Sequence, residues 1–93
     1  MGELPDECVH LVVTSPPYPM VALWDDFFTQ VSARNYNQMH AYLHQVWAEV
    51  ERVLVSGGLA CVNVGDATRT KDGVFHLYPN HSSVIQSFEN LGL

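Results

Sequence analysis

The sequence predicts an α/β fold, in which two parallel strands flank a helix and a further helix follows. Three observations lead to this prediction. Two short apolar runs, Cys8–Val13 and Leu59–Val64, have the length and the valine content of strands. A helical repeat of apolar residues fills most of the chain between them. A second helical pattern, Pro79–Leu91, comes after the second run, so the expected order is that of a right-handed βαβ unit with one more helix.

The first apolar run, Cys8–Val13, is nearly continuous and ends at Thr14-Ser15-Pro16-Pro17. A run without polar alternation is typical of a strand buried on both faces, as in a parallel sheet. The following residues, 19–35, mix prolines, acidic residues and aromatic residues, which indicates a loop with a short helical turn. Asp25 and Asp26 are interpreted there as carboxylates at the start of a helix.

The central helix is expected from about Asn37 to Leu54, with Asn35 or Asn37 as its cap. Gly57-Gly58 is expected to end it, because glycine accepts the left-handed conformation of a helix stop. Its apolar stripe follows helical spacing and consists of Met39, Leu43, Val46, Val50 and Val53, widened by Trp47 and Leu54.

After the second strand, Gly65-Asp66 breaks the apolar pattern. Residues 67–78 are interpreted as a polar loop that contains a turn at Lys71-Asp72-Gly73. The second helix carries Val84, Ile85, Phe88 and Leu91 on one side, and Gly92 would stop it.

Composition limits the possible functions. A chain of 93 residues holds one small domain, and it has neither a signal peptide nor the roughly 20 apolar residues of a membrane helix, so we expect a cytoplasmic protein. Cys8 and Cys61 are expected to be buried, reduced thiols. The net charge of −6 argues against a tight grip on DNA by this chain alone, because phosphate binding needs clustered lysine and arginine.

The loop after the first strand carries the chemistry. Sites in parallel sheets form beyond the carboxyl ends of strands, where Thr14-Ser15-Pro16-Pro17-Tyr18 lies. The rings of Pro16 and Pro17 fix their φ angles, so the loop is stiff. Because neither residue has an N–H, the loop presents mainly carbonyl acceptors. The Ser15 hydroxyl adds an acceptor and Tyr18 adds a flat aromatic face. This combination suits a heterocyclic base, with the ring stacked on the tyrosine and its exocyclic NH₂ group held by the acceptors.

Ser-Pro-Pro-Tyr after an apolar strand resembles the catalytic motif of the amino-group DNA methyltransferases, which modify cytosine N4 or adenine N6. The likeness covers nearly the whole chain. Arg52–Gly58 resembles the family's RVLKPGG turn, with Val55 and Ser56 in place of Lys and Pro. The other stretches that resemble one permuted branch are Leu4-Pro5-Asp6, Thr14–Met20, Trp24-Asp25, Asn63–Arg69 and Leu77–His81.

The resemblance implies a partial Rossmann-like methyltransferase fold, S-adenosylmethionine as cofactor and a base flipped out of duplex DNA. It implies that Ser15, Pro16, Pro17 and Tyr18 are the catalytic residues, with Ser15 and the Pro16 carbonyl on the target amine. Thr14 and Ser15, and more weakly Asp66, are the candidate cofactor contacts. Serine at the first motif position favours cytosine N4, with adenine N6 as the alternative. The family often belongs to restriction-modification systems.

The sequence lacks a strand that ends in a Gly-x-Gly-like loop, which the family uses for its cofactor. Residues 1–93 are therefore expected to be the catalytic-motif half of a methylase domain, with the cofactor loop and the target-recognition region elsewhere. The isolated chain is expected to be inactive. A decayed remnant and a module that depends on a partner chain remain open as alternatives.

Other interpretations are weaker. Protein-glutamine and RNA-adenine methyltransferases use an (Asn/Asp)-Pro-Pro-Tyr loop, but Ser15 and the permuted order count against them. His40 and His44 have a spacing that can bind zinc. Without a glutamate between them, a solvated helix face is the preferred interpretation. His76 and His81 are interpreted as loop and helix-start residues, so no metal is expected.

Overall fold

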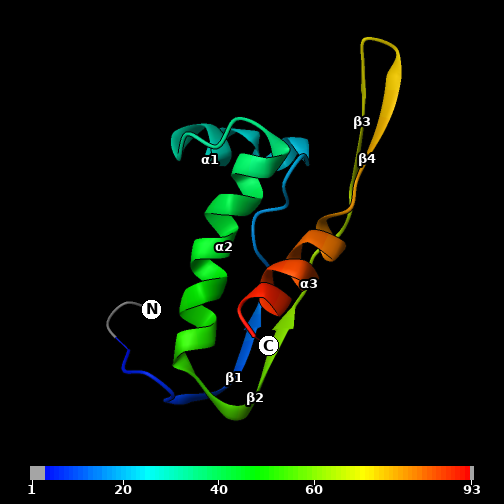
Figure 1. The fold of residues 1–93 in the computed structure, drawn as a ribbon. Helices are drawn as coiled ribbons and strands as arrows, with labels where there is room; N and C mark the ends of the chain where they lie inside the picture. The colour runs from blue at the N-terminus through cyan, green and yellow to red at the C-terminus, as the bar shows by residue number, and fades with distance from the viewer. Residues whose placement is uncertain (1–3, 93) are drawn as a thin grey trace.

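The computed structural model describes residues 4–92 and confirms the α/β class (Figure 1). Two parallel strands are followed by a separate antiparallel hairpin, and helices connect and cover them. The elements in chain order are β1 (Val9–Thr14), the short 3-10 helix η1 (Ala22–Trp24), α1 (Asp25–Gln30), α2 (Tyr36–Val53), β2 (Leu54–Val62), β3 (Ala67–Lys71), β4 (Val74–Tyr78) and α3 (Asn80–Asn90).

Strands β1 and β2 pair in parallel, as predicted, and α2 is the crossover between them. Leu11 lies opposite Leu59 and Thr14 opposite Val62, with an irregularity in the register between Val9 and Leu11. Because the two strands run the same way, the residues that follow Thr14 and Val62 emerge at the same edge of the sheet. This edge is where the predicted catalytic loop begins.

Helix α2 begins where the sequence predicts it. The Asn35 side chain accepts a hydrogen bond of 2.8 Å from the Gln38 N–H, which is the geometry of an N-cap. The helix buries the expected stripe, with Val46 only half-buried, and the buried residues are Met39, Leu43, Trp47, Val50 and Val53.

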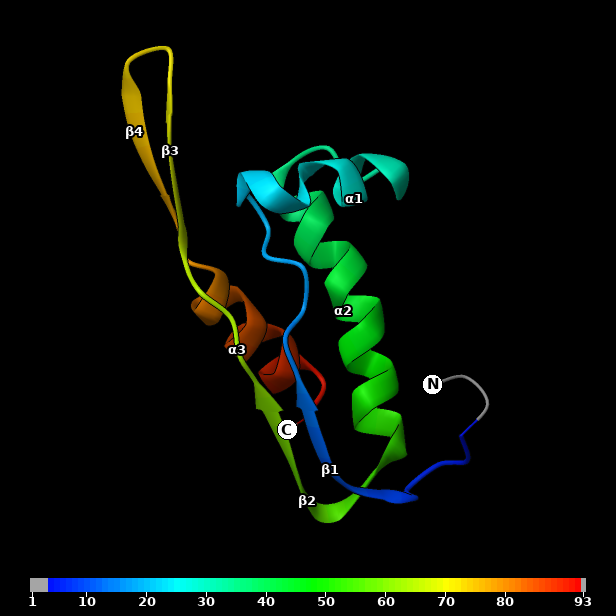
Figure 2. The same cartoon turned by 180° about the vertical axis from the view of Figure 1, so that it is seen from behind.

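The main core lies between the sheet and the two long helices. Val12, Ala60 and Val62 point from the strands toward α2 and α3, and they pack around Trp47 and Val84. Viewed from behind, the strands lie in front of α3, so both helices cover the same face of the sheet (Figure 2). A second, smaller cluster around Phe28 joins α1 to the start of α2.

The other face of the parallel sheet is open to solvent, which contradicts the prediction that both strands are buried on both faces. Val13 is 72% exposed, Leu11 55% and Leu59 65%. Cys8 and Cys61 are also exposed, although both remain unpaired thiols. The apolar pattern requires a covering layer, and no helix among the described residues supplies it on this side.

Gly57-Gly58 does not end the helix, contrary to the prediction. Helix α2 ends at Val53, and Leu54 already has the extended backbone of β2. Gly57 has a φ of +80° inside the strand, at the irregular part of its pairing with β1. A side chain at Gly58 would approach the His10 carbonyl oxygen to 3.1 Å, so the glycines permit a bend and a close approach of two strands.

Residues 67–78 form the β3–β4 hairpin and not the predicted polar loop. The predicted turn is confirmed at its tip, where Asp72 and Gly73 both have positive φ, as a two-residue hairpin turn requires. The hairpin projects beyond the body of the molecule (Figure 1). No helix within residues 4–92 is long and apolar enough to span a bilayer.

Candidate active site

The predicted catalytic loop leaves β1 at the edge of the sheet and is anchored at both of its ends. The Thr14 carbonyl accepts a hydrogen bond of 2.9 Å from Asn63 N–H, which ties the end of β1 to the residue after β2. Pro16 and Pro19 are buried, whereas Ser15 is exposed. The buried prolines fix the backbone of the loop, and the hydroxyl of the exposed serine remains accessible.

Tyr18 is held by the segment that follows β2. Its hydroxyl donates a hydrogen bond of 3.2 Å to the Asn63 carbonyl. Its ring lies against Gly65, where an added Cβ would be 3.4 Å from the ring carbon Cε2. Tyr18 remains half-buried, so the ring has a fixed position and still reaches solvent. Gly65 thus has a role that the sequence analysis did not assign, as the surface on which the ring rests.

The acceptors of the loop are available. Within residues 4–92, neither the Ser15 hydroxyl nor the Pro16 carbonyl takes part in a hydrogen bond. Acceptors on a stiff loop next to an aromatic ring can bind a planar group that carries two N–H donors. Burial of such a group against the loop would satisfy these acceptors.

Asn80 connects three segments that are distant in the sequence, and it is fully buried. Its amide nitrogen donates to the carbonyls of Pro19, at 2.8 Å, and Gly65, at 3.0 Å. Its amide oxygen pairs with Nε2 of His40, on α2, at 2.9 Å. One side chain therefore holds the loop after β1, the loop after β2 and the central helix together.

The Asn80 contacts also fix the state of His40. Because the amide nitrogen serves two carbonyls, the amide oxygen must accept, and His40 must donate from Nε2–H. Burial lowers the pKa of His40 below its ordinary 6.5, and the hydrogen bond to Asn80 partly opposes this effect. His40 is thus a neutral hydrogen-bond donor at neutral pH.

His40 and His44 face α3, which contradicts the interpretation of a solvated helix face. Both are half-buried, and His44 hydrogen-bonds with the Ser87 side chain through Nδ1. Their partners, Asn80 and Ser87, are both on α3. The four-residue spacing therefore places both rings on the face of α2 that packs against α3. In the described part of the chain, no three His, Cys, Asp or Glu side chains are grouped as metal ligands.

Asp66 lies at the carboxyl end of β2, and its carboxylate is bound to the start of α3. It accepts hydrogen bonds from the His81 backbone N–H, at 3.0 Å, and the His81 ring, at 2.7 Å. The His81 side chain first, and its backbone second, hold the pKa of Asp66 below the ordinary value. The carboxylate therefore orders the loop that carries Gly65, against which the Tyr18 ring lies.

Arg69, on β3, supports the other end of the catalytic loop. Its Nε donates to the Met20 carbonyl at 2.8 Å, and its guanidinium forms an ion pair of 2.6 Å with Asp25. Met20 has a φ of +66°, which is unfavourable for a residue with a side chain. Asp25 and Asp26 both lie in the first turn of α1, as interpreted. Sequence reasoning did not single out Arg69 or Asn80.

The glycine and the carboxylates near the predicted catalytic loop are engaged within the chain. Backbone approach to an adenosine cofactor needs a glycine turn, and a carboxylate is needed for its ribose hydroxyls. Gly65 is covered by Tyr18, Asp66 is engaged by His81, and Asp25 is engaged by Arg69. Of the candidate contacts, Thr14 is the last residue of β1 and Ser15 is exposed directly after it.

Curated relatives resemble nearly the whole chain. It is 47% identical to the type II methyltransferase M.MjaI of Methanocaldococcus jannaschii, over 99% of its own length and 38% of the relative's. It is 45% identical to the type II methyltransferase M.MthZI of Methanothermobacter thermautotrophicus, over 99% of its own length and 30% of the relative's. The chain thus spans about a third of these relatives.

Solved structures show the same fold. A putative DNA modification methylase from Thermus thermophilus superposes with a TM-score of 0.71 at 31% identity, over 98% of this chain and 35% of that one. Its complex with S-adenosyl-L-methionine superposes with a TM-score of 0.73 at 32% identity. The fold is therefore a partial Rossmann-like methyltransferase fold. The DNA methylase family model matches residues 9–92, and the chain belongs to this family.

Proposed function

We propose that this chain forms the catalytic-motif part of a DNA methyltransferase. The enzyme would transfer a methyl group from S-adenosylmethionine to the exocyclic amine of a flipped base, with cytosine N4 as the target. The observation that carries the proposal is the stiff loop of open acceptors at Ser15 and Pro16, next to the fixed ring of Tyr18. Membership in the DNA methylase family supports it.

The loop addresses the main difficulty of the reaction. An exocyclic amine is a weak nucleophile, because its lone pair is delocalised into the ring. If the Ser15 hydroxyl and the Pro16 carbonyl accept hydrogen bonds from the two N–H groups of the amine, the nitrogen becomes more pyramidal and its lone pair points away from the loop. Tyr18 stacks on the base and sets the direction of attack, while Pro17 keeps the backbone rigid. Catalysis is then a matter of position and electrostatics, without a covalent enzyme intermediate.

S-adenosylmethionine would supply a methyl group on a positively charged sulfur. The amine nitrogen forms the new bond to carbon as the carbon–sulfur bond breaks and its electron pair returns to sulfur. The nitrogen would then carry a positive charge and release one proton to water at the exposed loop. A carbonyl and a hydroxyl in contact with its N–H bonds stabilise that charge, so the acceptors act in the transition state and not only in binding.

Other parts of the enzyme would supply the remaining functions. The described residues contain no Gly-x-Gly-like loop after a strand, and the net charge of −6 gives little attraction for a phosphate backbone. We assign residues 1–93 to the catalytic-motif half of the domain. Target recognition and most cofactor contacts are assigned to residues outside this chain, in keeping with the third of the relatives that it spans.

A pair of Tyr18 variants tests the proposed role of the loop. In the protein as its natural gene encodes it, Tyr18→Ala should slow methylation of DNA at least tenfold, since base stacking on an aromatic ring contributes about 1–3 kcal/mol. Tyr18→Phe should keep much of the rate, because it loses only the exposed hydrogen bond to Asn63. Transfer of the tritiated methyl group is measured. Equal losses in both variants would show that the hydroxyl matters and that stacking is the wrong explanation.

A further inference from the structure

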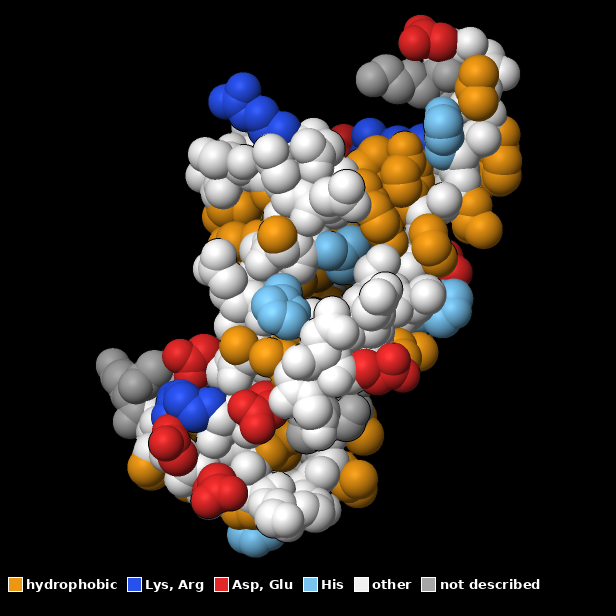
Figure 3. Space-filling model, viewed as in Figure 1, with side chains coloured by type: hydrophobic (Ala, Val, Ile, Leu, Met, Phe, Trp, Pro, Cys, Tyr) orange, Lys and Arg blue, Asp and Glu red, His pale blue; other side chains and the backbone are white. Residues whose placement is uncertain are grey.

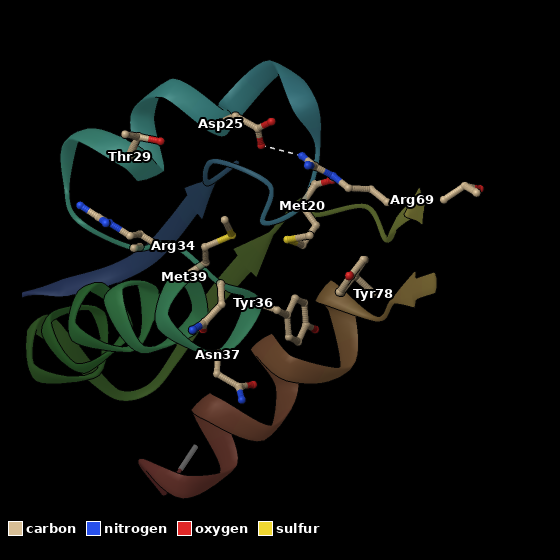
Figure 4. Close-up of a pocket in the computed structure, with 12 residues that line it drawn as sticks. Met20, Asp25, Thr29, Arg34, Tyr36, Asn37, Met39, Arg69 and Tyr78 are labelled. Atoms are coloured by element: carbon tan, nitrogen blue, oxygen red, sulfur yellow. Dashed lines mark hydrogen bonds and ion pairs between the residues drawn. The ribbon is translucent and has the colours of Figure 1, made fainter. Parts of the chain in front are cut away.

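A cavity of about 910 Å³ opens directly beyond the catalytic loop. Its walls come from α1, the first turn of α2 and the β3–β4 hairpin, and Met20, two residues after Tyr18, projects into it (Figure 4). Met20, Ala33 and Met39 form an apolar floor. Arg34, Asn37 and Arg69 belong to its polar part.

Arg34 is the available cation at the rim of this cavity, where its side chain points outward on the side opposite Arg69 (Figure 4). It is exposed, and its guanidinium has no hydrogen bond or ion pair within residues 4–92. Arg69 is already bound to Met20 and to Asp25, which neutralises most of its charge. The exposed amide of Asn37 adds a neutral hydrogen-bond donor nearby. These groups suit a ligand that carries a negative charge and several acceptors.

The few basic residues are distributed unevenly. Arg52 lies at the opposite end of the molecule and is paired with Asp6 and Glu49. Two other cationic side chains, Arg34 and Arg69, line the cavity. In Figure 3, acidic side chains gather mainly on the lower half, and basic ones appear near α1 and the hairpin. The end with the catalytic loop is therefore the less acidic end.

We propose that this cavity binds a backbone phosphate of the DNA strand that carries the target base, with Arg34 as the main phosphate ligand. The inference rests on the proposed function, because it places the strand next to the base held by Ser15 and Tyr18. Contact with a phosphate fixes the register of the strand without reading its sequence. The cavity would thus set how far the flipped nucleotide enters the catalytic loop.

The salt dependence of DNA binding tests this proposal. A phosphate contact contributes about −0.9 to the slope of log K against log salt concentration. Fluorescence anisotropy of a short labelled duplex is measured with the protein as its natural gene encodes it. Arg34→Ala should reduce the steepness of this slope by about 0.9, so that the loss of affinity between about 50 and 200 mM salt is roughly 3.5-fold smaller. Arg34→Lys should restore most of the slope.

Arg52→Ala is the matched control, because it removes an arginine of the opposite end that is held by two carboxylates. Its slope should equal that of the unmodified protein. An unchanged slope in Arg34→Ala would overturn the proposal, as would equal changes in both variants or tighter binding of the matching RNA duplex. If Arg34→Ala leaves the slope unchanged while methylation of DNA is retained, only this inference fails. Absence of methylation in the unmodified protein would instead remove the proposed function.

Discussion

Asn80 should control the stability of the catalytic end of the molecule. Asn80→Ala leaves the carbonyls of Pro19 and Gly65 and the N–H of His40 without their partner. A buried polar group that loses its partner destabilises a fold by about 1–3 kcal/mol. Only the contact with Pro19 is fully buried, and the effects of neighbouring contacts are not additive. We therefore expect Asn80→Ala to lower the free energy of unfolding by about 2–4 kcal/mol.

The chemistry of the amide gives a sharper test than its removal. Asn80→Asp keeps the volume and the oxygen that accepts from His40, but it turns a second oxygen toward two carbonyl oxygens. This variant should be at least as unstable as Asn80→Ala at neutral pH, since a buried carboxylate would place one of its two oxygens against two carbonyl acceptors. Asn90→Ala, at the exposed end of the same helix, is the control and should change the stability by less than about 0.5 kcal/mol.

The free energy of unfolding in urea gives the stability of each variant, and transfer of a labelled methyl group gives its activity. Asn80→Ala should reduce the rate of methylation even where the protein remains folded, because the loop after Tyr18 is no longer fixed. A change in stability within about 0.5 kcal/mol of the control would refute the argument that Asn80 connects the three segments.

Two further predictions follow from the site. Because burial lowers the pKa of His40, neutral His40 contributes stability that is fully present above pH 6.5 and is lost as the pH falls through the lowered pKa. When the free energy of unfolding in urea is measured against pH, His40→Gln should show a smaller decrease below pH 6.5 than the unmodified protein. The same decrease in both proteins would contradict the conclusion that His40 is buried in its neutral form. Residues 1–93 alone should not bind S-adenosylmethionine tightly in calorimetry, since the described residues contain no Gly-x-Gly-like loop after a strand. Binding with a dissociation constant of about 1 μM, or −8.2 kcal/mol, would show that a cofactor site exists in this chain.

The sequence predicts well those features that arise from local patterns. The apolar spacing of α2 and its cap at Asn35 depend on neighbouring residues, and both are confirmed. The parallel pairing of β1 and β2 follows from the order strand, helix, strand. Pro16 and Pro17 end β1 by their own geometry, which explains why the strand ends at Thr14, where the sequence predicts it.

Features that depend on distant contacts were not predictable in this way. Ala67-Thr68-Arg69-Thr70 carries no apolar alternation, because Arg69 occupies one of its two inward positions, so the sequence favours a loop. Asp72-Gly73 signals the turn of the hairpin, and the β-branched and aromatic residues of Val74–Tyr78 are a second local signal that the interpretation as a loop overlooked. Asn80 becomes important only when three separate segments meet around it, and nothing in its immediate neighbours indicates burial.

The strands show a different limit. An apolar run indicates that both faces of a strand are suited to burial, but it does not say which layer covers them. Helices α2 and α3 cover one face, and Leu11, Val13 and Leu59 remain exposed on the other. The prediction failed because the covering element is not among the described residues, although the apolar character of that face was correctly identified.

The central claim is that the loop from Ser15 to Tyr18 directs methylation to an exocyclic amine. The most direct test is mass spectrometry of nucleosides from DNA that has been treated with the protein as its natural gene encodes it. We predict N4-methylcytosine, at a level that falls sharply in Tyr18→Ala. N6-methyladenine would preserve the amino-group chemistry and correct the assigned base. Only 5-methylcytosine, or no methylated nucleoside, would contradict the account.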